Sequence, residues 1–198
     1  MMKKLLNPLA YYNTKTLLFI GIITHLLFCY IAYATHSFFP DFLSIKKSTI
    51  DFKFIDIIYQ NTRSIAIAIL VLFAVGKFIN SRTRIIDIVN VVLISRIAYY
   101  MVFVTDFIPI INKKVEHLTE GVASNNLSVL QDASTMTVIV IVAFIAIAFI
   151  ALMFYYLYIS FKTVTNLKTL PQVFAFIAAI LFIIISTSIL SLIIPQTI

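Results

Sequence analysis

Three polar side chains interrupt an otherwise apolar stretch of the sequence, RIIDIVNVVLISRIAYYMVF (84–103). Asp87, Asn90 and Arg96 stand where a membrane-spanning helix would carry aliphatic residues. A charge near the middle of a span costs about 2.5 to 3.5 kcal/mol on insertion scales, so Arg96 needs a partner or water. A guanidinium there can donate to carbonyls and hydroxyls, or bind an anion such as a lipid phosphate. These residues are therefore the first candidates for a ligand- or lipid-binding site.

The position of each residue suggests a different role. Asp87 lies in the first turn of a helix that begins near Ile85, where the helix N-terminus and Arg84 three residues earlier both stabilise a negative charge. Asn90 is expected to hydrogen-bond to a neighbouring helix. Because nine residues at about 100° each place Asp87 and Arg96 on opposite faces, Arg96 must face other helices, a polar cavity or lipid head groups. Its candidate partners on other spans are all uncharged or weakly basic: Thr24, His25, Ser186, Thr187, Ser188 and Ser191.

His25 and Cys29 share one helix face, but no second histidine or cysteine lies in the spans. Transition-metal and haem sites need more protein ligands, so no metal or cofactor is predicted. His25 is the fourth candidate for the ligand- or lipid-binding site, and we expect it to bond to a hydroxyl or carbonyl of a neighbouring helix. Three titratable residues outside the spans are assigned to a solvated helix face rather than to a cation: Glu116, His117 and Glu120.

Motifs of common enzyme classes are absent from the sequence. It contains no glycine-rich phosphate loop, no G-x-S-x-G and no H-E-x-x-H. A non-enzymatic protein is therefore predicted.

The composition indicates what must position these residues. Of the 198 residues 62% are hydrophobic and 12% charged, with a mean hydropathy of +1.05, whereas soluble domains carry about 25% charged residues. This is typical of an integral membrane protein. The net charge of +7 does not indicate nucleic acid, because no solvated surface interleaves basic and aromatic residues.

Five segments reach the roughly 20 apolar residues that a spanning helix needs. They are residues 17–35, 64–80, 85–105, 136–160 and 171–194, with outer loops at 36–63 and 106–135. The second span has an alternative start near Phe54, because TIDFKFIDII (50–59) suits either an interfacial helix or an extension of that span. In PIINKKVEHLTEG (109–121) the apolar residues recur at helical spacing, which predicts a short amphipathic helix that Gly121 ends. Residues 1–198 are thus expected to form a single all-α, polytopic membrane helical bundle.

Lysine and arginine indicate the orientation. With the N-terminus cytoplasmic and the C-terminus outside, the cytoplasmic segments carry eight basic residues and no acid: Lys3, Lys4, Lys15, Lys77, Arg82, Arg84, Lys162 and Lys168. The outer segments carry six basic residues and seven acids. The positive-inside rule favours this arrangement.

Several stretches resemble the Yip family of five-span membrane proteins. RIIDIVNVVLISRIAYY is similar to a D-x-x-N-x(5)-R pattern of bacterial Yip-like proteins, which maps onto Asp87, Asn90 and Arg96. NPLAYY (7–12) and FYYLYISFKTVTNLKTLPQVFAFIAAI (154–180) also resemble the family. The resemblance implies a five-span fold in a bacterial cytoplasmic membrane and suggests a role in membrane organisation or transport. The long N-terminal region of eukaryotic members, which bind Rab GTPases, is missing, so Rab binding is not carried over.

Two functions remain open from the sequence. One is a scaffold or adaptor that binds membrane lipids, other membrane proteins or a second copy of itself. The other is a small permease or permease subunit in which Arg96 lines a path for an anionic substrate. A water-accessible cavity at Arg96 would favour the permease, and an Arg96 packed against helices or facing a lipid head group would favour the scaffold.

Overall fold

The computed structural model describes residues 7–48, 51–194 and 196–197. Within them, five helical segments are long and apolar enough to cross a membrane, which confirms the predicted all-α bundle. Four of the segments are single α-helices: α2 (Thr14–Ala34), α3 (Phe54–Ile79), α6 (Ala133–Thr165) and α7 (Leu170–Ile193). The fifth is α4 (Ile85–Tyr100), which η2 (Met101–Phe107) continues as a 3₁₀-helix. The chain is a multi-pass integral membrane protein.

Shorter elements connect these spans. They are η1 (Pro8–Ala10), the antiparallel strands β1 (Ser37–Phe38) and β2 (Lys46–Lys47), the helix α5 (Pro109–Ala123) and η3 (Leu127–Gln131). α5 is the predicted amphipathic helix, but it continues two residues past Gly121, so the prediction that Gly121 ends it was wrong. A Cβ at Gly121 would lie 2.3 Å from Val129 Cγ2, so the glycine allows η3 to pack closely against α5.

The second span begins ten residues before the predicted residue 64. Its alternative start is the correct one, because α3 runs from Phe54, where Asp56 Oδ2 accepts a hydrogen bond from Lys53 N at 2.9 Å. A carboxylate in the first turn stabilises a helix N-terminus. The loop predicted to be the first outer one is therefore 36–53, not 36–63, and we call these residues the outer loop. Residues 49 and 50 of that loop lie outside the described part of the chain.

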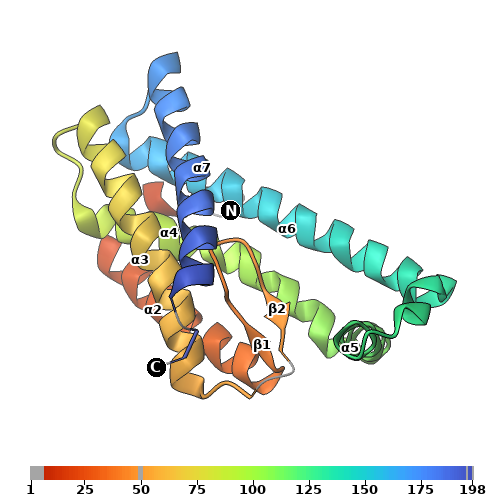
Figure 1. The fold of residues 1–198 in the computed structure, drawn as a ribbon. Helices are drawn as coiled ribbons and strands as arrows, with labels where there is room; N and C mark the ends of the chain where they lie inside the picture. Colours follow the sequence, from red (N-terminus) through yellow and green to blue (C-terminus); the bar gives the residue numbers. More distant parts are fainter. Residues whose placement is uncertain (1–6, 49–50, 195, 198) are drawn as a thin grey trace.

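The connections divide the bundle into two ends, which we call the turn side and the loop side. The turn side holds the short connections 80–84 and 166–169, the second of which is set by Asn166 in a left-handed conformation (φ 56°) and Thr169 before α7. The loop side holds the β1–β2 hairpin, α5 and the C-terminal segment, where Gln60 Nε2 donates to the Gln196 carbonyl at 2.6 Å (Figure 1). Which side is cytoplasmic stays a prediction, and Lys3 and Lys4 are not among the described residues.

The α4 helix occupies the centre of the bundle. Of the 18 consecutive residues that make each span most apolar, 72% are buried in the α4 span and 6% in α6. The α4 span is the more buried because α2, α3 and α6 all pack around it. At the crossing with α2, a Cβ on Gly21 would lie 2.8 Å from Leu93 Cβ, so the glycine permits the close contact. The polar residues of α4 therefore face protein on most sides.

The α6 helix is longer than the bilayer requires. Its 33 residues extend for about 50 Å at about 1.5 Å per residue, whereas the hydrocarbon is about 30 Å thick. Tilting accommodates such an excess, and Figure 1 shows α6 running obliquely to α3 and α7, with α5 beside its first turns.

Candidate functional site

Arg96 lies in the middle of the α4 span and is completely buried, with 0% of its surface exposed. Its Nη1 donates to the Phe42 carbonyl and its Nη2 donates to Asn61 Oδ1 at 3.0 Å. Asn61 lies in the extension of α3 and Phe42 in the outer loop. Both groups are supplied by the chain itself, so backbone and amide oxygens take the place of a bound anion.

Three aromatic rings surround the same guanidinium. Its Cζ lies 4.9 Å from the ring centres of Phe42 and Tyr99 and 5.1 Å from that of Tyr100. Two charge-assisted hydrogen bonds contribute about 1.5 to 3 kcal/mol each, and a desolvated cation–π contact about 2 kcal/mol. These interactions exceed the insertion cost of about 2.5 to 3.5 kcal/mol. Arg96 makes no ion pair with the residues that the structure describes, and its Nε has no hydrogen-bond partner among them.

A turn in the outer loop brings Phe42 to the arginine. Asp41 Oδ1 accepts hydrogen bonds from Leu43 N at 2.8 Å and Ser44 N at 2.9 Å, as aspartate commonly does in tight turns. The Phe42 amide donates to Thr187 Oγ1 of α7 at 3.3 Å. Thr187 was a predicted partner of Arg96, and it instead holds the loop residue that bonds to Arg96.

His25 joins this site through Asn61 and Tyr100. Asn61 Nδ2 donates to Tyr100 Oη at 2.8 Å, and His25 Nδ1 lies 3.4 Å from both atoms. His25 Nε2 lies 3.1 Å from Thr62 Oγ1, which confirms the predicted contact with a hydroxyl of another helix. We call Arg96, Phe42, Asn61, Tyr99, Tyr100 and His25 the Arg96 cluster. It ties α2, α3, α4 and the outer loop together.

Asp87 and Asn90 lie apart from the Arg96 cluster, near the turn side. Asp87 accepts two hydrogen bonds from Arg84, at 2.8 and 2.9 Å, and this contact raises the pKa of the Arg84 guanidinium. Asn90 Nδ2 donates to the Thr14 carbonyl of α2 at 3.0 Å. Both contacts confirm the predicted local roles. The four candidate residues therefore form two separate groups.

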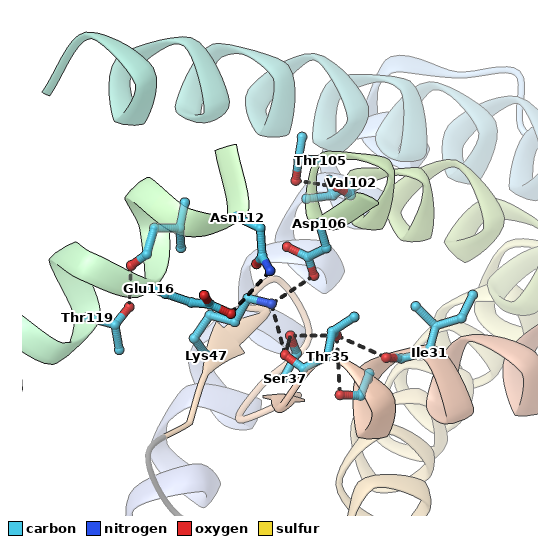
Figure 2. Close-up of polar contacts among 12 residues, drawn as sticks. Ile31, Thr35, Ser37, Lys47, Val102, Thr105, Asp106, Asn112, Glu116 and Thr119 are labelled. Atoms are coloured by element: carbon cyan, nitrogen blue, oxygen red, sulfur yellow. Dashed lines mark hydrogen bonds and ion pairs between the residues drawn. The ribbon is translucent and has the colours of Figure 1, made fainter. Parts of the chain in front are cut away.

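A second polar group lies on the loop side. Lys47 Nζ is 3.1 Å from Asp106 Oδ2 and donates to the Thr35 carbonyl at 2.8 Å, with the two charged side chains only 15% and 13% exposed. Figure 2 shows Lys47 between the end of α2 and η2, with Asn112 and Glu116 of α5 beside it. The pair ties the hairpin to the end of the α4 span.

Two pockets adjoin this ion pair. One, of about 410 Å³, lies between the hairpin, η2, α5 and α6, and the other, of about 320 Å³, lies between the hairpin and α5. Lys47 and Thr119 line both. Among the described residues, no three histidine, cysteine, aspartate or glutamate side chains are placed to hold a metal ion.

The junction of α5 with α6 depends on Asp132. Hydrogen bonds from Thr135, Lys114 and Ser134 lower the pKa of this carboxyl well below its usual range. Its contribution to stability is present in full above the ordinary aspartate pKa of about 3.9 and is lost as the pH falls below it. We expect the α5–α6 junction to be equally stable at pH 7 and pH 5 and to loosen below about pH 4. A ¹³C titration of the carboxyl checks the pKa. In Asp132→Asn the loosening in acid should disappear, and an unchanged response would exclude Asp132 as its cause.

Sequence reasoning missed Phe42, Asn61, Lys47 and Asp106. The sequence did contain a signal for Asn61, which is its helical spacing to Ile57, Ser64 and Ala68. In the structure all four residues lie on the buried face of α3. Nothing comparable indicates Phe42 or the Lys47–Asp106 pair, because their places depend on how the loop folds onto the bundle.

Compared with known proteins, the chain matches no family model, no curated protein and no solved structure.

Proposed function

We propose that the protein is a non-enzymatic membrane scaffold or adaptor that binds membrane lipids or partner membrane proteins. The closed Arg96 cluster carries this proposal. Arg96 is completely buried and bonds to Phe42 and Asn61 of its own chain, so it ties the outer loop to the bundle. A substrate-binding arginine in a permease would instead face water for part of the transport cycle. The resemblance to the Yip family and the bacterial membrane stay predictions.

Cys29 tests whether water reaches the cluster. It is the single cysteine of the chain, is 0% exposed, and its Sγ accepts from Asn61 Nδ2 at 3.4 Å. We expect a water-soluble, membrane-impermeant thiol reagent to leave Cys29 unmodified in proteoliposomes and to modify it after unfolding in detergent. Mass spectrometry of the intact protein measures the adduct.

Two exposed serines provide matched controls, one on each side of the bundle. In a Cys29→Ala background, Ser81→Cys and Ser124→Cys should each react when the reagent is supplied to both faces. Rapid modification of Cys29 in the folded protein would support the permease and count against the scaffold.

Lipid and partner binding is tested by native mass spectrometry of protein extracted with its surrounding membrane. We expect wild-type chains to carry bound phospholipid or a partner protein above the mass of the chain itself. Wild-type protein that is released bare under the mildest activation would contradict the scaffold.

A further inference from the structure

The apolar face of α5 lies over a pocket rather than over a packed core. Val115, Leu118, Thr119 and Val122 follow the i, i+3, i+4, i+7 spacing of one helix face, and all four line the pocket of about 410 Å³. In α5 only Gly121 is buried. An amphipathic helix is stabilised chiefly by covering its apolar face, so something apolar should fill this space.

The opposite wall of the pocket belongs to two membrane spans. Val102 and Phe103 come from the end of the α4 span and Val142 from α6. The pocket volume falls within the 300 to 1,000 Å³ typical of small-molecule sites. Because spans are surrounded by acyl chains, the molecule that can supply an apolar segment at this level is a lipid.

The rim of the pocket carries charges of both signs. Lys46 is exposed on one edge, and Glu116 and Glu120 line the adjoining pocket of about 320 Å³, which shares Lys47 and Thr119 with the first. Lys47 is already paired with Asp106. Lys46, Glu116 and Glu120 form no ion pair with other described residues. A head group that complements this rim has an anionic and a cationic part.

We infer that these two adjoining pockets together bind one zwitterionic phospholipid with a primary ammonium head group. One acyl chain lies under α5, the phosphate lies at Lys46, and the ammonium lies toward Glu116 and Glu120. An anionic lipid such as phosphatidylglycerol has no cation to offer the carboxylates, and a quaternary ammonium has no N–H to donate to them. The inference rests on the proposed function, because it names the lipid class and the site of a lipid-binding scaffold.

Native mass spectrometry in mixed micelles of phosphatidylethanolamine, phosphatidylcholine and phosphatidylglycerol with identical acyl chains tests the head group. We expect wild-type protein to retain phosphatidylethanolamine preferentially. The double variant Glu116→Gln with Glu120→Gln should reduce that preference about threefold, because an ion pair between exposed groups contributes only weakly to binding. Both residues are exposed, so the double variant should fold normally. Equal retention of the three lipids, or a preference for phosphatidylglycerol, would overturn the assignment.

Two variants of α6 test the pocket. Val142→Phe places a larger side chain in the wall and should lower lipid retention about tenfold, because buried methylenes supply the chain's affinity. Val140→Phe changes a neighbouring residue that is 51% exposed and is not among the pocket residues, so it should retain lipid as the wild type does. If Val142→Phe retains as much lipid as Val140→Phe, the pocket is rejected but the scaffold proposal stands. If the wild type carries no lipid at all, lipid binding by the scaffold is contradicted as well.

Discussion

Replacing Arg96 with leucine is expected to lower the free energy of unfolding by about 2 to 4 kcal/mol while the chain still inserts into the membrane. The substitution leaves the Phe42 carbonyl and Asn61 Oδ1 without their donor. An unpaired buried acceptor costs about 1 to 3 kcal/mol. Removing a midplane charge makes insertion of α4 easier, so the loss concerns the folded bundle and not its insertion.

The same substitution should release the outer loop. Phe42 loses both its hydrogen bond and its ring contact with Arg96, so the segment that continues to β2 is held less tightly. Trypsin should then cleave at Lys46 and Lys47 faster than in the wild type. Thermal unfolding in detergent measures the accompanying loss of stability.

An exposed arginine provides the control for this prediction. Arg84 bonds to Asp87 at the surface, so Arg84→Leu should leave both the melting temperature and cleavage within residues 36–48 unchanged. If Arg96→Leu digests in the loop at the wild-type rate, the arginine does not hold the loop, and the basis of the scaffold proposal is lost.

Hydropathy was sufficient to predict the spans but not the start of α3. The residues of its first three turns include Asp56, Gln60, Asn61 and Ser64, which lower the hydropathy although all four are buried. Asp56, Gln60 and Asn61 bond to loop or neighbouring-helix groups, as Gln60 Oε1 does when it accepts from the Phe39 amide at 3.2 Å. Ser64 donates to the Gln60 carbonyl of α3 itself. A search for polar residues that continue the period of an apolar helix face would have extended the span.

The local contacts of the candidate site were predictable, and the long-range ones were not. Arg84 with Asp87 follows from helical spacing, and the contact of His25 with a hydroxyl follows from the need to satisfy a buried ring nitrogen. The partners of Arg96 come from a loop 54 residues away and from the helix extension that the sequence offered only as an alternative. Sequence pattern carries no direct information on how a loop folds back, so Phe42 could not be identified.

Breaking the Lys47–Asp106 pair is expected to produce the other large loss, about 2 to 4 kcal/mol for either single substitution. Asp106→Asn leaves the Lys47 ammonium beside the Thr35 carbonyl without a counter-charge, and Lys47→Met leaves a poorly solvated carboxylate. Removing one partner of a mostly buried pair costs more than removing both, because the remaining charge stays desolvated. The double variant Lys47→Met with Asp106→Leu should therefore be more stable than either single variant.

A double-mutant cycle on thermal or denaturant unfolding measures the coupling between Lys47 and Asp106. The cycle for Arg84 and Asp87 is the matched control, because that pair has the same charges but an exposed arginine, 67% exposed against 15% for Lys47. Coupling should be clearly larger for Lys47 and Asp106, since burial weakens screening by water. Additive effects at Lys47 and Asp106 would mean that the ion pair does not fasten the hairpin to the end of the α4 span, and that the hairpin stays in place through its other contacts.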